Sequence, residues 1–214
     1  MIKIFPQKHH RRNGFSLIEL LTVMAVFSIL TAATLPALRG TLDGYNISGA
    51  ADLVGAELAL ARQTAISRNL PVEVRIYRHN DGTEEAWRVL GLVIPAAASG
   101  AEEDEWIAPG KVLPGNILFD DNGDFSTIVS EADASLVPRR GTEAATAPGI
   151  LKNKEYVAFR FQPDGSTNLP TNQAWCMTLR SPRSSPEGGM PAANYVSIVL
   201  DSLTGRSMTF QPGF

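Results

Sequence analysis

An apolar run near the N-terminus constrains the fold of this chain more than any other feature. Residues 15–35 form a stretch of 21 residues in which Glu19 is the only charged side chain. As an α-helix, which rises 1.5 Å per residue, this stretch is about 31 Å long, close to the roughly 30 Å hydrocarbon core of a bilayer. The run therefore predicts a membrane-spanning helix.

Charge is distributed unevenly around this run. It is preceded by no acidic residue and by four basic ones, Lys3, Lys8, Arg11 and Arg12. The positive-inside rule then places the N-terminus in the cytoplasm and the bulk of the chain across the membrane. Of 19 Lys and Arg, four lie in residues 1–14, so 15 remain against 22 Asp and Glu, a net charge of −7. Such an acidic body argues against nucleic-acid binding, which needs basic surface to neutralise phosphates.

Glu19 can be explained in three ways. One is a secretory signal peptide with a small-residue cleavage site at residues 31–33, but the apolar run is long for such a peptide and a carboxylate does not fit within it. An uncleaved anchor fits the length but gives the carboxylate no role. A cut between Gly14 and Phe15 would create an amine one helical turn from Glu19. In staggered neighbouring helices the carboxylate of one chain could then pair with the amine of the next, which largely offsets the cost of a buried charge.

The stretch "RRNGFSLIELLTVMAVFSIL" closely resembles the class III signal of type IV pilins and type II secretion pseudopilins. The resemblance implies that Gly14 precedes the cut and that Phe15 becomes the N-methylated first residue of the mature protein. Glu19 then matches the acidic fifth position, and Pro36 matches the proline that bends the long helix. The implied protein is a substrate of prepilin peptidase rather than an enzyme. Its implied partners are the inner membrane and other pilins or pseudopilins, with the C-terminal domain periplasmic and open to incorporation into a periplasmic or surface filament.

The next segment also predicts a helix. Pro36 lacks a backbone donor, so we expect a kink or interruption there and a new start capped by Ser48. One apolar stripe then recurs at a spacing of three to four residues, and it consists of Val54, Leu58, Ala61 and Ala65. The proline at position 71 ends the pattern.

Strand patterns dominate the remainder. Residues 72–77 alternate apolar and polar side chains, which predicts a half-buried strand, and residues 86–94 predict the returning strand of a hairpin. Further strands are expected within residues 111–119, 155–166, 174–181, 195–206 and 207–212. Residues 95–110 and 120–152 are expected to be loops. A long helix followed by strands predicts an α+β fold with an antiparallel sheet.

The expected organisation has four parts: a cleaved leader over residues 1–14, a transmembrane and assembly helix over 15–38, a soluble half of the helix over 39–70 and a β-sheet domain over 71–214. Residues 58–76, which run from the end of the expected helix into the first expected strand, resemble the H-type pseudopilins (GspH) and the FimT/FimU minor pilins. The same resemblance covers Phe161, Pro163 and Gly165, and the late Thr204, Gly205 and Arg206.

Candidate chemistry in the body is sparse. Asp120, Asn122 and Asp124 alternate as in an EF-hand loop, with Glu131 at the twelfth position, but Phe125 replaces the required glycine. We therefore interpret them as an acidic turn rather than a calcium site, and no cofactor is expected. Cys176 is the only cysteine, so no intramolecular disulfide can form, and it is expected in the core. Two of the three histidines, His9 and His10, lie in the leader, so we expect neither a Cys–His pair nor a His/Cys zinc cluster in the mature chain.

Two functions remain open. One is a minor pilin or pseudopilin of a secretion pseudopilus or a type IV pilus, between which the sequence does not choose. The other is a DNA- or surface-binding module displayed on a pilus. It is not favoured, because the only basic clusters are Arg139 with Arg140 and Arg180 with Arg183.

Overall fold

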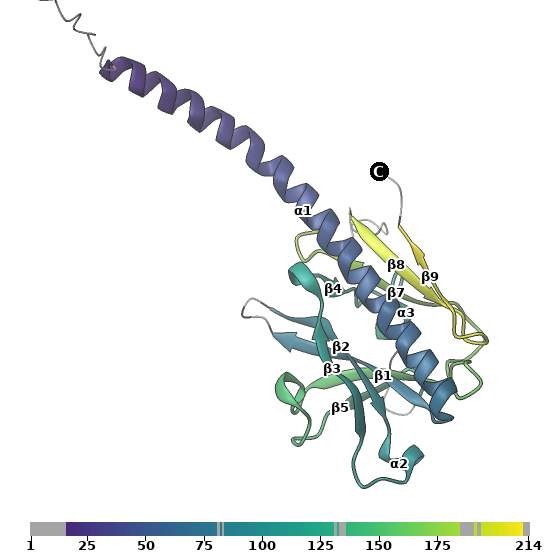
Figure 1. The fold of residues 1–214 in the computed structure, drawn as a ribbon. Helices are drawn as coiled ribbons and strands as arrows, with labels where there is room; N and C mark the ends of the chain where they lie inside the picture. The colour runs from purple at the N-terminus through teal and green to yellow at the C-terminus, as the bar shows by residue number, and fades with distance from the viewer. Residues whose placement is uncertain are drawn as a thin grey trace, which may run out of the picture. The chain divides into compact units, whose positions relative to one another are not determined.

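The computed structural model describes residues 16–80, 82, 84–130, 132, 136–184, 191 and 194–211, with the side chains of residues 34–41 and 109 excepted (Figure 1). The chain divides into two compact units, Met1–Thr41 and Leu42–Phe214. The expected cleavage site, Gly14 and Phe15, lies outside the described residues.

The first element is the long helix α1, which spans Leu17–Arg68. It continues through Pro36, so the expected interruption there and the restart at Ser48 are wrong. A single proline removes one hydrogen bond of the ladder, and the alanine- and leucine-rich sequence on both sides keeps the flanking turns helical. The predicted bend at Pro36 stays a prediction.

The second unit, Leu42–Phe214, is called the body below, and it contains two antiparallel sheets. The five-stranded sheet has the order β3 (Glu105–Val112), β2 (Glu85–Ile94), β1 (Val72–Asn80), β6 (Glu155–Phe161) and β5 (Arg139–Thr142). The four-stranded sheet has the order β4 (Leu118–Phe119), β7 (Trp175–Arg180), β8 (Tyr195–Leu200) and β9 (Ser207–Phe210). The α+β prediction with antiparallel pairing is confirmed, with two sheets in place of one.

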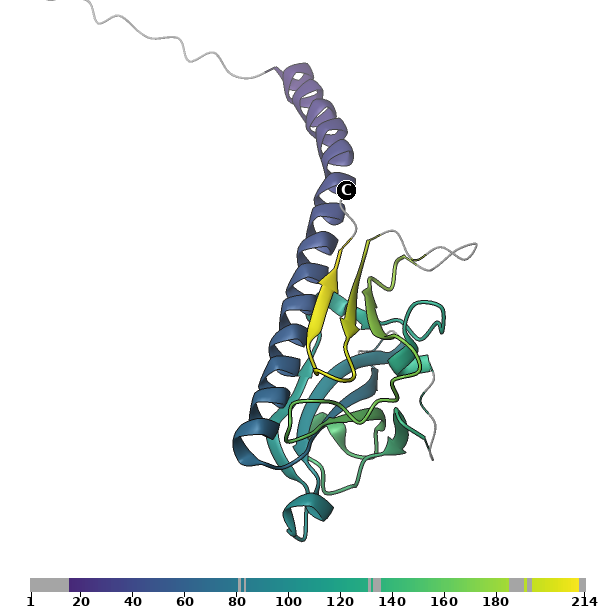
Figure 2. The same cartoon turned by 90° about the vertical axis from the view of Figure 1, so that its right-hand side faces the viewer.

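From Leu42 onward, α1 packs along these sheets, as both views of the fold show (Figures 1 and 2). The predicted stripe of Val54, Leu58, Ala61 and Ala65 is buried to 1 % exposure or less. It shares one core with apolar side chains of β1, β2, β6, β7 and β8. The amphipathic interpretation of this helix segment is therefore confirmed.

Both expected loops contain regular structure. Residues 95–110 hold the short helix α2 (Ala96–Ser99) and most of β3, and residues 120–152 hold α3 (Thr127–Ser130), β5 and the 3₁₀ turn η2 (Gly149–Leu151). The strand expected over residues 111–119 is divided by η1 (Pro114–Asn116). The reason is local, because Pro114 cannot donate to a ladder and Gly115 adopts a φ of +61°.

Strand β1 is buried on both faces, so its interpretation as half-buried is wrong. Its apolar side chains enter the core, but Glu73, Arg75 and Tyr77 on the opposite face are only 1, 4 and 0 % exposed. A second cluster with Tyr77 covers that face, and its other buried members are Val89, Ala147, Leu151, Tyr156 and Ala158. The segment after β5, expected to be a free loop, thus forms a third layer.

Two glycine turns that are distant in sequence meet at α1. Gly165 and Gly205 have φ values of +85° and +63°, and a Cβ at Gly205 would lie 2.1 Å from the carbonyl oxygen of Gly165. Arg62 of α1 donates from Nε to the carbonyl oxygens of Gly165 (3.1 Å) and Thr204 (3.0 Å). Only glycine tolerates this close approach of two backbones.

Candidate assembly helix and body pocket

The first part of α1 presents an apolar surface. Its large side chains are between 52 and 79 % exposed, and they are Leu17, Ile18, Leu20, Leu21, Val23, Met24, Val26, Phe27, Ile29 and Leu30. Soluble monomers rarely expose a contiguous apolar patch of this length, so such a surface marks a contact with a partner or a lipid.

Three hydroxyl side chains within this stretch form hydrogen bonds with the backbone of the helix itself. The hydroxyls of Thr22, Ser28 and Thr31 donate to the carbonyl oxygens of Glu19, Met24 and Phe27 at 2.9, 2.8 and 2.8 Å. A hydroxyl that bonds back to its own helix needs no water, which suits the stretch to apolar surroundings. By length and hydropathy, no helix qualifies as a membrane span over the part of the chain that the structure describes.

Glu19 lies in the first turn of α1. A carboxylate there is favoured by the positive end of the helix dipole. Its proposed partner, the amine of Phe15, is outside the described residues, as is the side chain of Pro36.

The acidic turn after β4 is held by the chain's own groups. Asp120 is 1 % exposed, and its Oδ1 lies 3.4 Å from Arg180 Nε and accepts from the backbone N–H of Asn122 at 3.2 Å. The side-chain oxygen of Asn122 in turn accepts from the N–H of Asp124 at 3.0 Å. Among the described residues, no group of three or more His, Cys, Asp or Glu side chains is placed to hold a metal ion.

The arginines considered for nucleic acid all lie beside carboxylates. The pairs are Arg139 with Glu73 (3.4 Å), Arg140 with Glu155 (3.3 Å), Arg180 with Asp120 (3.4 Å) and Arg183 with Asp43 (3.5 Å). Their positive charge is therefore offset within the fold.

Cys176 is a free thiol that is only partly buried. The prediction of a core position is wrong because its strand neighbours Trp175 and Met177 take the core-facing positions, at 3 and 0 % exposure. The alternation of β7 turns the side chain of Cys176 to the other face, where its Sγ lies 3.7 Å from Thr127 Oγ1.

A buried cluster around Arg75 is the feature that sequence reasoning missed. Its guanidinium pairs with three carboxylates: Nε with Glu73 Oε1 (2.7 Å), Nη1 with Glu143 Oε2 (2.8 Å) and Nη2 with Asp104 Oδ2 (2.6 Å). The hydroxyl of Tyr77 also donates to Glu143 Oε2, at 2.7 Å. The opposite charges of residues 73 and 75, two apart on one strand face, were the available signal.

The charges in this cluster alter one another's ionisation. Burial alone would raise the pKa of Glu73, but Arg75 and Arg160 outweigh it and hold that pKa below its usual value. Burial likewise acts against the charge of Arg75, yet the carboxylate of Glu73 raises its pKa overall. Burial and the hydrogen bond to Glu143 raise the pKa of Tyr77, so the phenol stays neutral.

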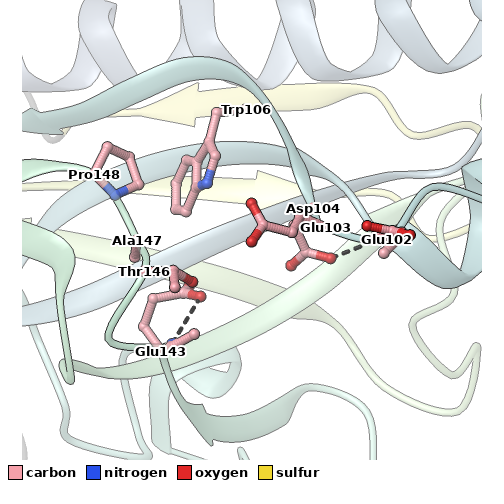
Figure 3. A pocket seen from close by; sticks show the side chains of 10 residues that line it. Glu102, Glu103, Asp104, Trp106, Glu143, Thr146, Ala147 and Pro148 are labelled. Carbon is pink, nitrogen blue, oxygen red and sulfur yellow. Dashed lines mark hydrogen bonds between the residues drawn. The ribbon is translucent and has the colours of Figure 1, made fainter.

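Beside this cluster lies a pocket of about 600 Å³. One wall is the segment between α2 and β3 with Glu102, Glu103 and Asp104, and the other is the segment after β5 that begins with Glu143. Trp106 of β3 also lines it, and Figure 3 shows its indole ring together with the carboxylates.

Two family profiles match the chain. The prokaryotic N-terminal methylation motif matches residues 9–35, which contain Gly14, Phe15 and Glu19. The type II transport protein GspH matches residues 50–203, more than two thirds of the chain. No curated protein and no solved structure matches the chain. With its N-terminal methylation motif and a helix-plus-sheet body matched over most of its length, the chain belongs to the GspH family of type II transport proteins.

Proposed function

We propose that this protein is a structural subunit, a minor pilin or pseudopilin, of a secretion pseudopilus or a type IV pilus. Prepilin peptidase cuts between Gly14 and Phe15 and methylates the new amine of Phe15. The apolar helix then anchors the subunit in the inner membrane, with the body on the periplasmic side, until it enters a filament.

The observation that carries this proposal is the exposed apolar surface of residues 17–30, interrupted by the single carboxylate of Glu19. Such a surface is stable only when lipid or other apolar helices cover it. Exposed Leu42, Tyr45, Leu60 and Ile66 extend apolar character along the body part of α1. Packing against neighbouring helices would cover both stretches.

Glu19 has a specific role in this proposal. Its carboxylate pairs with the methylated amine of Phe15 in a neighbouring subunit, which sets the axial stagger of the two helices. A charge buried without its partner costs several kcal/mol, so the pair favours one register over all others.

The test compares Glu19→Ala with Glu19→Asp in cells that assemble the filament. We expect Glu19→Ala to be processed and membrane-inserted but absent from sheared or cross-linked filaments. Glu19→Asp keeps the charge and is expected to retain partial incorporation. Wild-type incorporation of Glu19→Ala would overturn the pairing role.

A further inference from the structure

The pocket beside Arg75 has walls that the buried cluster holds in place. Asp104 accepts from Arg75 Nη2 at 2.6 Å and, through its other oxygen, from the N–H of Ala96 at 2.9 Å, which ties down the segment before β3. Glu143 accepts from Arg75 Nη1 at 2.8 Å and from Tyr77 at 2.7 Å, which ties down the opposite wall. One buried guanidinium thus fixes both sides, so the pocket is preorganised.

The pocket carries a surplus of negative charge. Asp104 and Glu143 share the single positive charge of Arg75. Glu102 and Glu103 line the pocket at exposed positions, and within the described parts of the chain no ion pair reaches either of them. The chain without its leader is also acidic overall, at −7 from 15 basic and 22 acidic residues. Both the local and the overall field therefore favour a cationic partner.

The apolar part of the pocket narrows the choice of cation. Trp106 is half-buried, and a Cβ on Gly91 would come within 3.2 Å of its ring, so the indole is seated on the backbone of β2 while it lines the pocket. Ala147 and Pro148 add further apolar lining. A guanidinium stacks on an indole and can form two parallel hydrogen bonds to a carboxylate, whereas an ammonium acts as a point charge.

From this geometry we propose that the pocket binds an arginine-bearing extended segment of another protein. The guanidinium lies against Trp106 and pairs with Glu102 or Glu103. A volume of about 600 Å³ exceeds what one guanidinium fills, so it accommodates the flanking residues of the segment as well. The site lies wholly in the body and does not depend on the proposed role of the N-terminal helix.

The experiment uses the full-length chain in detergent and titrates it with the peptide acetyl-Gly-Arg-Gly-Arg-Gly-amide. We expect saturable 1:1 binding by calorimetry, quenching of tryptophan fluorescence, and an affinity that falls with added salt. The matching lysine peptide is expected to bind more weakly. The double variant Glu102→Gln/Glu103→Gln should raise the Kd of the arginine peptide by about tenfold.

A matched control removes two carboxylates elsewhere. The variant Asp52→Asn/Glu85→Gln changes net charge equally at exposed positions outside the pocket, and its Kd should stay within about twofold of the wild type. Trp106→Leu should abolish the preference for arginine over lysine. Circular dichroism verifies that each variant is folded, and Glu19→Ala should bind the peptide like the wild type.

Three results would overturn the proposal. They are the absence of saturable binding, an equal loss of affinity in both double variants, and competition by spermidine at the potency of the arginine peptide. The last result would mean that positive charge alone is recognised.

Discussion

At the scale of single residues, Arg75 determines how the second face of the five-stranded sheet is built. Its guanidinium is 4 % exposed and contacts carboxylates from β1, from the segment before β3 and from the segment after β5. The alternation of apolar and polar residues along β1 predicts that Arg75 faces solvent. This prediction fails because alternation cannot show which distant segments cover a sheet face. The burial of Arg75 follows from long-range packing.

Replacing Arg75 with methionine tests the importance of this cluster. Glu143 would be left buried without its cation, and Glu73 would keep only Arg139 and Arg160. We therefore expect Arg75→Met to lower the free energy of unfolding by about 3–5 kcal/mol. Chemical denaturation of the full-length chain in detergent measures the change. The control Arg68→Met removes the ion pair between Arg68 and Glu105, whose side chains are both about half exposed. That loss should cost at most about 1 kcal/mol, and equal effects of the two substitutions would contradict the assignment.

Glu73 makes stability depend on pH. Its pKa is lower in the folded state than in the unfolded state, so the folded form binds the proton less readily. The stabilisation is present above the unfolded pKa of about 4.3 and is lost as the pH falls through the folded value. We expect the urea midpoint to drop as the pH is lowered from 5 to 3. Glu73→Gln should be less stable at pH 7 and show a flatter profile, and an unchanged slope in this variant would argue against the role of Glu73.

At the scale of elements, regular patterns were predictive and irregular ones were not. The spacing of apolar residues and the turn residues predict the buried stripe of α1, the hairpin β1–β2 and the strands β6 to β9. Strand β3 lies within small and acidic residues, and β5 is only four residues long, so neither has a recognisable alternation. Both owe their conformation to pairing with β2 and β6. Propensity is therefore overridden by tertiary contact at these edges.

The paired glycine turns give a prediction at this scale. Gly205→Ala forces an alanine to a φ of +63° and places its Cβ 2.1 Å from the carbonyl oxygen of Gly165. We expect a loss of about 3 kcal/mol or more in the free energy of unfolding, from strain and displacement of the Arg62 contacts together.

Gly100→Ala is the control for strain alone. Gly100 has a φ of +73°, but a Cβ there would meet no atom within 4 Å. This variant should lose only about 1 kcal/mol. If both alanine variants lose the same amount by chemical denaturation, the close approach of the two turns contributes nothing to stability.

At the scale of the whole molecule, the sequence joins an apolar helix that needs a partner to a body with its own core. The methylation motif and the GspH match fall on these two parts in turn. The function class was predictable because the leader, Gly14, Phe15 and Glu19 are contiguous in sequence. The body pocket was not, since its walls lie about forty residues apart in sequence and Arg75, from a third segment, pairs with both of them.

The most direct measurement is the N-terminus of the protein recovered from membranes of a cell that contains prepilin peptidase. Intact-mass and tandem mass spectrometry should find a chain that begins at Phe15 and carries one added methyl group on its amine. A chain that retains residues 1–14, or one cut after Ala33 as a secretory signal would be, contradicts processing as a pilin-like subunit.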